Sequence, residues 1–140
     1  MQIKVKKLHI DAILPKHART GDVGMDLYSI ETVTIAPQTH AQVRTGVAFE
    51  IPLGYAGLIW DKSSVAQKGG LKTMGGVIDS GYRGEILVGL ANLSNKSYTF
   101  EKGHKVAQML IQKVEQSEIV DVDELSDSER GTGAFGSTGK

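Results

Sequence analysis

The segment Asp61–Gly70, which reads DKSSVAQKGG, has the residue types of a phosphate-binding site. Its two serines precede a predicted short helix over Ser64–Lys68, where hydroxyls and free backbone N–H groups would attract an anion. Lys62 adds a positive charge beside them. Alternatively, Ser63 or Ser64 is an ordinary N-cap of the predicted helix. For this segment taken alone, capping is favoured over phosphate binding. The spacing of glycine, lysine and serine does not match a Walker A loop.

A second candidate is the segment Gly75–Ile86, which reads GGVIDSGYRGEI. Val77 and Ile78 end a short apolar run, and the carboxylate of Asp79 follows at once. The Ser-Gly pair after it predicts a β-hairpin turn. A carboxylate, the phenol of Tyr82 and a guanidinium would then meet at the tip of this hairpin. Asp is also a common turn former, and for this segment alone that interpretation is favoured.

Two further polar residues stand in otherwise apolar surroundings. Asp26 lies in the segment TGDVGMDLYS, where a carboxylate can hold a hard cation through water. A solvated turn explains that segment equally well. Gln108 interrupts the apolar run VAQMLI, and a polar amide there needs hydrogen-bond partners. The alternative for Gln108 is an edge position that is open to water.

The C-terminal residues Arg130–Lys140, RGTGAFGSTGK, form a glycine-rich tail. Arg130 can bind a phosphate through its planar guanidinium, and Phe135 can stack on a base. The hydroxyl and backbone N–H groups of Gly136–Gly139 can wrap an anion. Taken alone, the tail is better explained as a flexible low-complexity end. We therefore predict one β domain over residues 1–129 and a flexible arm over residues 130–140.

The composition excludes several classes of protein. A chain of 140 residues suffices for one domain with a real core. Sixteen basic and sixteen acidic residues cancel, which argues against a nucleic-acid-binding face. The chain has no cysteine, which excludes disulfides and thiolate metal sites. No apolar run approaches the roughly 20 residues that span a bilayer, so we expect a cytoplasmic protein without nucleic-acid or membrane partners.

The hydrophobic pattern is mostly of period two, in short runs that glycine interrupts, which predicts an all-β fold. No long segment has a helical period. Many short strands with glycine-rich turns indicate a sandwich, barrel or jelly roll. The expected strands are Ile3–Leu8, Thr32–Ile35, Gln42–Glu50, Tyr55–Trp60, Glu85–Asn92, Lys96–Phe100 and Lys105–Val114.

The order of the polar segments is more informative than any one of them. They follow one another across nearly the whole chain, around Asp26, Lys62, Asp79, Gln108 and Arg130. In this order the sequence resembles the trimeric dUTPases (deoxyuridine 5′-triphosphate nucleotidohydrolases), whose five motifs have counterparts here from about residue 20 to residue 139. The patterns GVID-x-x-YRGE and RG-x-G-x-FGSTG are the most specific of them.

The resemblance implies a jelly-roll-like β-clip fold and a homotrimer whose active sites each draw on all three chains. It implies hydrolysis of dUTP to dUMP and pyrophosphate, with Mg²⁺ on the triphosphate. This reaction limits uracil in DNA and supplies dUMP for dTMP synthesis. The glycine-rich arm of one subunit would close as a lid over a neighbouring site.

Carried over position by position, the resemblance assigns a role to each candidate. Asp79 would orient and activate the water that attacks the α-phosphorus, and Gln108 would bond a phosphate oxygen or help to place that water. Asp26 would hold Mg²⁺ through its water shell. The substrate-binding residues would be Lys62, Ser63 and Ser64 for the phosphates, Gly76, Val77 and Ile78 for uracil, Tyr82 for deoxyribose and, from another subunit's arm, Arg130, Phe135, Gly136, Ser137 and Thr138.

Several positions depart from the family pattern. Lys62 and Lys105 stand where the family usually has Arg, so the charge is kept and the bidentate fork is lost. Gly81 stands where Asp is frequent. Ala134 stands where Gly is usual, which would restrict closure of the arm if a positive φ is needed there.

The sequence leaves three alternatives to hydrolysis of dUTP. The related dCTP deaminases share the fold but carry a glutamate ten residues after the hairpin aspartate, where this chain has Gly89. A non-enzymatic nucleotide sensor would gain nothing from a further anion at Asp79. A plain structural jelly roll would leave the ordered set of segments unexplained.

Overall fold

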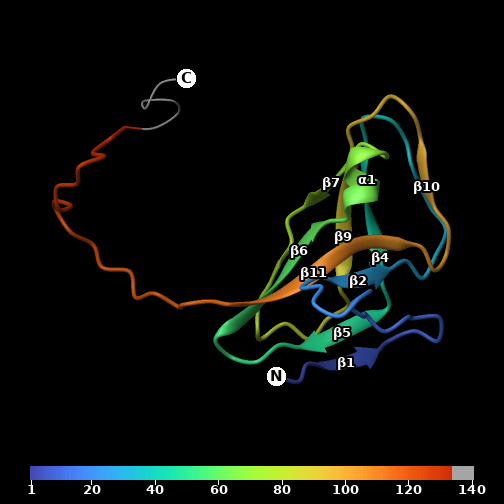
Figure 1. Ribbon diagram of the computed structural model, residues 1–140, viewed down its shortest axis with the longest axis horizontal. Helices are drawn as coiled ribbons and strands as arrows, with labels where there is room; N and C mark the ends of the chain where they lie inside the picture. Colours follow the sequence, from blue (N-terminus) through green and yellow to red (C-terminus); the bar gives the residue numbers. More distant parts are fainter. Residues whose placement is uncertain (134–140) are drawn as a thin grey trace.

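The structure, a computed structural model, describes residues 1–133 of the chain (Figure 1). Nearly all regular structure in this part is β, as predicted. One short helix, α1 (Ser63–Gln67), follows the sixth strand. The strands are β1 (Lys4–Lys7), β2 (Met25–Tyr28), β3 (Val33–Ile35), β4 (His40–Arg44), β5 (Val47–Glu50), β6 (Tyr55–Asp61), β7 (Leu71–Met74), β8 (Val77–Ile78), β9 (Leu87–Asn92), β10 (Tyr98–Phe100) and β11 (Lys105–Lys113).

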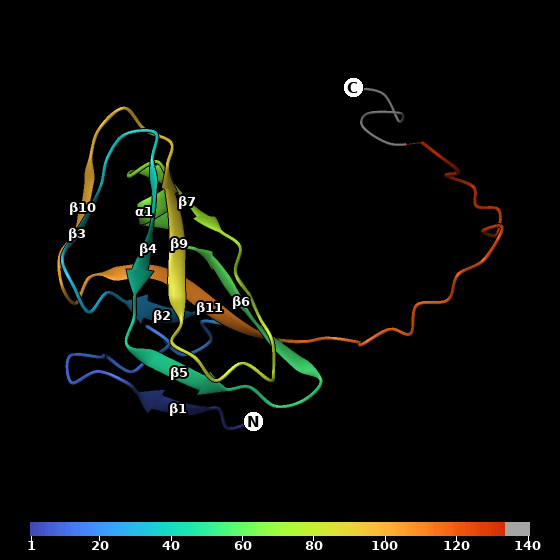
Figure 2. The ribbon, with the colours of Figure 1, turned by 180° about the vertical axis from the view of Figure 1, so that it is seen from behind.

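Two antiparallel sheets enclose the core. One has the order β2-β11-β6-β8 and the other has the order β4-β9-β7. Strand β9 shows why the sequence forms them: Val88, Leu90 and Asn92 are buried, while the residues between them are more exposed. Buried apolar side chains from both sheets, such as Met109 and Val88, belong to one cluster. Two smaller pairs, β1-β5 and β3-β10, extend the body (Figure 2).

The predicted strand Gln42–Glu50 is two strands, because the chain turns at Thr45–Gly46. Gly46 has a φ of +67°, and a Cβ atom at this position would lie 2.9 Å from Ile30 and 3.0 Å from Ala12. Glycine is therefore required both by the backbone conformation and by the close packing. Strand β4 joins the β9 sheet, whereas β5 leaves it and pairs with β1.

The predicted hairpin over Gly75–Ile86 is wrong. Its first arm, β8, pairs with β6, so that Ile78 lies opposite Gly57. Its second arm, β9, pairs with β4 and β7 in the other sheet. Residues 79–85 therefore form a loop that connects the two sheets, which we call the 79–85 loop. The local pattern did predict a turn, but the partners of both strands come from elsewhere in the chain.

The pattern did not predict β2 or β7, which have only four residues each. After β11 the chain leaves the body, and residues 114–133 are extended and contain no strands (Figures 1 and 2). From here on, the arm means this whole segment after β11, which includes the start of the glycine-rich tail. The predicted flexibility of the glycine-rich end stays a prediction, because residues 134–140 lie outside the described part. Within the described part, no helix is long and apolar enough to cross a membrane.

Candidate active site

Three of the five polar segments meet where β2, β11 and β6 lie side by side. Gln108 on β11 lies opposite Asp26 on β2 and opposite Trp60 on β6. Its side-chain amide donates to the backbone carbonyl of Asp61 at 2.9 Å. The sheet register thus brings together residues that are far apart in the sequence. We call Asp26, Lys62, Lys105 and Gln108 the Asp26 cluster.

Asp26 is a buried carboxylate between two lysines. Its Oδ1 atom lies 3.3 Å from Nζ of Lys62, and its Oδ2 atom lies 2.6 Å from Nζ of Lys105. Burial alone would raise the pKa of Asp26, but the close ammonium groups of Lys105 and Lys62 outweigh it and hold the pKa below its ordinary value. The carboxylate is therefore ionised at neutral pH, and it raises the pKa of Lys105 in turn.

The side chain of Gln108 rests on Gly24. A Cβ atom at position 24 would collide with Oε1 of Gln108, which explains why glycine stands there. The amide end of Gln108 is held by Asp61, as described above. Gly24 and Asp61 thus position Gln108, and neither contact was predicted from the sequence.

Asp61 also fastens β7 to the end of β6. Its carboxylate accepts hydrogen bonds from the backbone N–H and hydroxyl of Thr73, at 2.8 and 2.7 Å, and lies 2.6 Å from Nζ of Lys72. Burial alone would raise the pKa of Asp61, and the bonds from Lys72 and Thr73 lower it below the ordinary value. These bonds fix the backbone at Asp61 and thereby position the segment that follows it, including Lys62.

Helix α1 places Ser63 and Ser64 at its exposed start. The prediction that one of these serines is the N-cap is wrong, because the N-cap is Lys62 and no side chain caps the helix. The carbonyl of Lys62 accepts the N–H groups of Val65 and Ala66 at 2.9 Å each. Both serine hydroxyls consequently face solvent beside the Asp26 cluster.

Asp79 and Tyr82 lie in the 79–85 loop, and both are exposed. The N–H of Tyr82 donates to the carbonyl of Asp79 at 3.1 Å, and its hydroxyl donates to the carbonyl of Glu85 at 2.9 Å. Both side chains line a cavity of about 280 Å³ together with Val77 and Ile78. Asp79 also borders a cavity of about 760 Å³ at the start of the arm.

The 79–85 loop and the Asp26 cluster are not adjacent within one chain. Strands β8 and β11 flank opposite edges of β6, and the pair Gly57–Ile78 lies near one end of β6 while Trp60–Gln108 lies near the other. From strand spacing and rise per residue, Asp79 and Gln108 are roughly 15 Å apart. A single chain therefore carries two separate half-sites.

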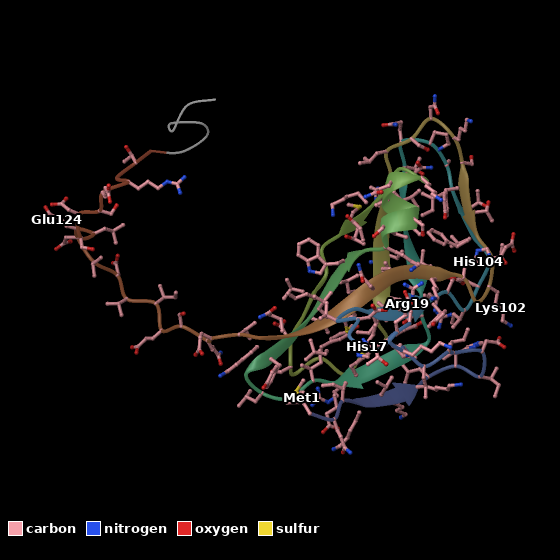
Figure 3. The ribbon with its side chains drawn as sticks, in the orientation of Figure 1. Met1, His17, Arg19, Lys102, His104 and Glu124 are labelled. Carbon is pink, nitrogen blue, oxygen red and sulfur yellow. The ribbon has the colours of Figure 1, made fainter. Side chains whose placement is uncertain are left out.

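Within the described part of the arm, only the first residues, 114–116, lie near a half-site, where they border the cavity beside Asp79. Arg130 hydrogen-bonds within the arm, from Nε to the carbonyl of Gly133 at 2.8 Å. The acidic part of the arm, marked by Glu124, projects away from the β body (Figure 3). The candidates Phe135, Gly136, Ser137 and Thr138 lie outside the described residues.

Comparison with known proteins identifies the family. The sequence model of the dUTPase family matches residues 11–139, so the chain belongs to the dUTPase family. A deoxyuridine 5′-triphosphate nucleotidohydrolase from Nautilia profundicola is 46% identical over 142 residues, with 100% of both chains covered. One from Thermobifida fusca is 44% identical and covers 99% of this chain and 79% of the relative.

Solved structures of the same family share the fold. A mutant dUTPase of Staphylococcus bacteriophage 80alpha with dUpNHpp matches with a TM-score of 0.93 at 33% identity, over 99% of both chains. A mutant dUTPase from phage phi11 of Staphylococcus aureus matches with a TM-score of 0.83 at 29% identity, over 89% of this chain and 98% of that chain. The latter structure describes the coordination of a structural Mg(II) ion. The predicted fold, an all-β jelly-roll-like β-clip, is confirmed.

Proposed function

We propose that this protein hydrolyses dUTP to dUMP and pyrophosphate in the cytoplasm, by attack of an activated water on the α-phosphorus. The relatives named above carry this activity in their names, and the phage 80alpha structure holds a dUTP analogue in the same fold. The observation that carries the proposal is the Asp26 cluster, which holds two cations and an amide beside the exposed serines of α1. Such a set suits a triphosphate better than a neutral ligand.

The triphosphate end of the substrate would bind at the Asp26 cluster. Lys62 and Lys105 are compact point charges on flexible stems, so they can swing from Asp26 to phosphate oxygens without a change in backbone. Ser63 and Ser64 would donate their exposed hydroxyls to the same phosphates. Gln108 is held on one side by Asp61, and we propose that it contacts an α-phosphate oxygen or the attacking water.

The donor set at Asp26 fits a magnesium ion that keeps its water shell. In the described part of the chain, no group of three His, Asp or Glu residues could cage a metal. Mg²⁺ characteristically binds through one or two carboxylates, several waters and substrate phosphates. Oδ2 of Asp26 has no hydrogen bond of good geometry despite its ion pair with Lys105, so it can accept one from such a water. When bound, Mg²⁺ would neutralise charge on the triphosphate.

The nucleoside would bind along β8 and the 79–85 loop. Strand β8 is an edge strand, paired with β6 on one side, so backbone groups of Gly76, Val77 and Ile78 that do not bond to β6 can pair with the polar edge of uracil. The carbonyl of Gly76 is not one of them, because it accepts the N–H of Ile59 at 2.8 Å. Tyr82 would lie against the deoxyribose and exclude a 2′-hydroxyl. Asp79 would act as the general base for the attacking water.

A complete site would require a second chain. The base and the phosphate-binding groups must both reach the α-phosphorus within hydrogen-bond range. The separation of roughly 15 Å between Asp79 and Gln108 within one chain does not permit this. We therefore propose a site shared between chains, in which one chain supplies the Asp26 cluster and its neighbour supplies the 79–85 loop. The resemblance to the trimeric dUTPases implies that this assembly is a homotrimer.

The third contribution to each site would come from an arm. The extended residues 114–133 leave the body and can carry the C-terminus to another subunit (Figure 1). Arg130 would bind the γ-phosphate, Phe135 would cover uracil, and Gly136, Ser137 and Thr138 would wrap the phosphates. Ordering of this arm over the substrate would exclude bulk water.

The test is product analysis with dUTP, dCTP, dTTP and UTP offered in parallel with magnesium. We expect dUMP and pyrophosphate from dUTP and little turnover of the other three. Release of ammonia from dCTP would place the chain with the deaminases instead. Binding of dUTP without any product would contradict the enzymatic proposal and favour a sensor.

A further inference from the structure

We propose that Glu85 is a positioning residue that anchors the 79–85 loop to the β4–β5 turn and thereby sets selectivity for the deoxyribose. The inference rests on the proposed function, in which Tyr82 lies against the sugar. Glu85 lines the same cavity as Asp79 and Tyr82, but its carboxylate is bonded to Arg44 and Gly46. Its effect on the substrate would act through the orientation of Tyr82.

The carboxylate of Glu85 is bound by two residues of the β4–β5 region. Nε and Nη2 of Arg44 donate to Oε2 at 3.2 and 3.0 Å, and the backbone N–H of Gly46 donates to Oε1 at 2.8 Å. The Glu85 side chain is 19% exposed, whereas that of Arg44 is 48% exposed. A forked Arg contact with a further backbone donor fixes a carboxylate far better than a solvated ion pair does.

The anchor point is itself rigid. Gly46 lies in a tight turn against Ile30 and Ala12, as described above. Next to it, the hydroxyl of Thr45 donates to the carbonyl of Ile86 at 2.6 Å. Three contacts from this turn region thus hold residues 85–86, which is where the 79–85 loop ends.

The orientation of Tyr82 depends on the same end of the loop. Its hydroxyl donates to the backbone carbonyl of Glu85 at 2.9 Å. Its ring lies over Gly84, where a Cβ atom would collide with Oη and Cζ of the tyrosine. The other end of the loop, at Asp79, is fixed separately because Ile78 pairs with β6. Loss of the Glu85 anchor should therefore free Tyr82 more than Asp79.

This asymmetry yields a specific kinetic expectation. A loosened Tyr82 would weaken both the packing against deoxyribose and the exclusion of a 2′-hydroxyl. We expect E85A to lower the ratio of kcat/KM for dUTP over UTP by about 10-fold, mainly through a higher KM for dUTP, with kcat within about 3-fold of wild type. R44A leaves the Gly46 contact in place, so its effect should be about 3-fold.

The experiment combines these kinetics with hydrogen exchange of the full-length protein without nucleotide. In E85A we expect the amides of residues 80–86 to exchange about 10-fold faster, with little change elsewhere. E85Q keeps the shape and one acceptor for Gly46, so it should fall between E85A and wild type. The matched control is E101Q, which alters an exposed carboxylate that accepts a hydrogen bond from Thr32, away from the 79–85 loop. We expect E101Q to match wild type in both measurements.

Two results would contradict the proposed role of Glu85. Unchanged exchange in both E85A and R44A would show that the carboxylate does not hold the loop. Faster exchange with an unchanged ratio of kcat/KM for dUTP over UTP would show that the contacts of Glu85 do not set the selectivity for deoxyribose. A wild-type protein without dUTP turnover would refute the proposed function and the selectivity claim with it, while the exchange data would still test the anchoring.

Discussion

Two carboxylates on neighbouring parts of the fold, Asp26 and Asp79, lie toward opposite ends of strand β6 and are in opposite situations. Asp26 on β2, whose partner Lys62 directly follows β6, is 6% exposed and has a lysine at each oxygen. Asp79, near the other end, is exposed and borders open cavities. A buried charge must be compensated within its own chain, because an unpaired one would be costly. An exposed carboxylate is solvated by water and has no such requirement. It can therefore stay unpaired until substrate and a neighbouring chain surround it.

The difference explains which half-site is already formed in a single chain. At the Asp26 cluster, the buried charge is paired with two lysines of the same chain, so the cations are in place before any phosphate arrives. At the 79–85 loop, the backbone is held at both ends, but the catalytic candidate faces solvent. Each prediction below alters one end and leaves the other intact.

The largest effect is expected at the exposed end, from D79N. Loss of the general base should lower kcat by about 10³-fold, while dUTP still binds because the phosphate-binding groups are untouched. Steady-state kinetics and equilibrium binding of dUTP test the two parts. The control D123N makes the same chemical change at an exposed aspartate in the arm. Full activity of D79N would show that Asp79 is not the base.

A smaller effect is expected at the buried end, from D26N. The two lysines would lose their shared partner, and the proposed metal–water shell would lose its carboxylate, so kcat/KM should fall by about 10²-fold. Titration with magnesium should also show that D26N needs a higher magnesium concentration than wild type for half-maximal activity. An unchanged magnesium dependence would contradict the role proposed for Asp26.

A third prediction concerns the contact of Gly24 with Gln108. The extra methyl group of G24A would displace the Gln108 side chain and lower kcat by about 10-fold. The effect should vanish in a Q108A background, because the displaced group is then absent. A full effect of G24A in that background would assign it to some other consequence of the methyl group.

The smallest effect is one on stability, at Asp61. The folded state lowers its pKa, so the stability that Asp61 contributes is complete above its unfolded pKa of about 3.9 and is lost as the pH falls through the folded value. D61N should be about 1–2 kcal/mol less stable at neutral pH. The difference from wild type should shrink as the pH falls below the unfolded pKa of Asp61 and through its lowered folded value.

Denaturant unfolding at several pH values measures this difference. The control D127N changes an exposed aspartate in the arm and should follow wild type throughout. A D61N difference that stayed constant with pH would mean that the ionised form of Asp61 does not stabilise the fold.

The sequence predicted the strands that alternate strongly and missed what depends on distant partners. Strand β9 alternates in burial and strands β6 and β11 are long, so their positions were predicted within a few residues. The turn at Gly46 looks like a continuous strand until the packing against Ile30 and Ala12 is known. The hairpin prediction failed for the same reason, since β8 pairs with β6 and not with the strand that follows it.

The site residues were predicted individually, and their arrangement was not. The motif order pointed to Asp26, Lys62 and Gln108, but only the sheet register shows that they share one place. The backbone carbonyl of Asp61 that holds Gln108 leaves no mark in the sequence. The pairing of Glu85 with Arg44 likewise joins positions 41 residues apart without a local pattern.

The central claim is that each site combines the Asp26 cluster of one chain with the 79–85 loop of another. The direct test uses two variants that are each nearly inactive, D79N and the double variant K62A/Q108A. Equal amounts are unfolded and refolded together, and dUTP hydrolysis is compared with that of the variants refolded separately and then mixed. Random assembly should give intact residues at both ends in about a quarter of the sites, and so restore about a quarter of wild-type activity. Co-refolded protein no more active than the separately refolded mixture would contradict a site shared between chains.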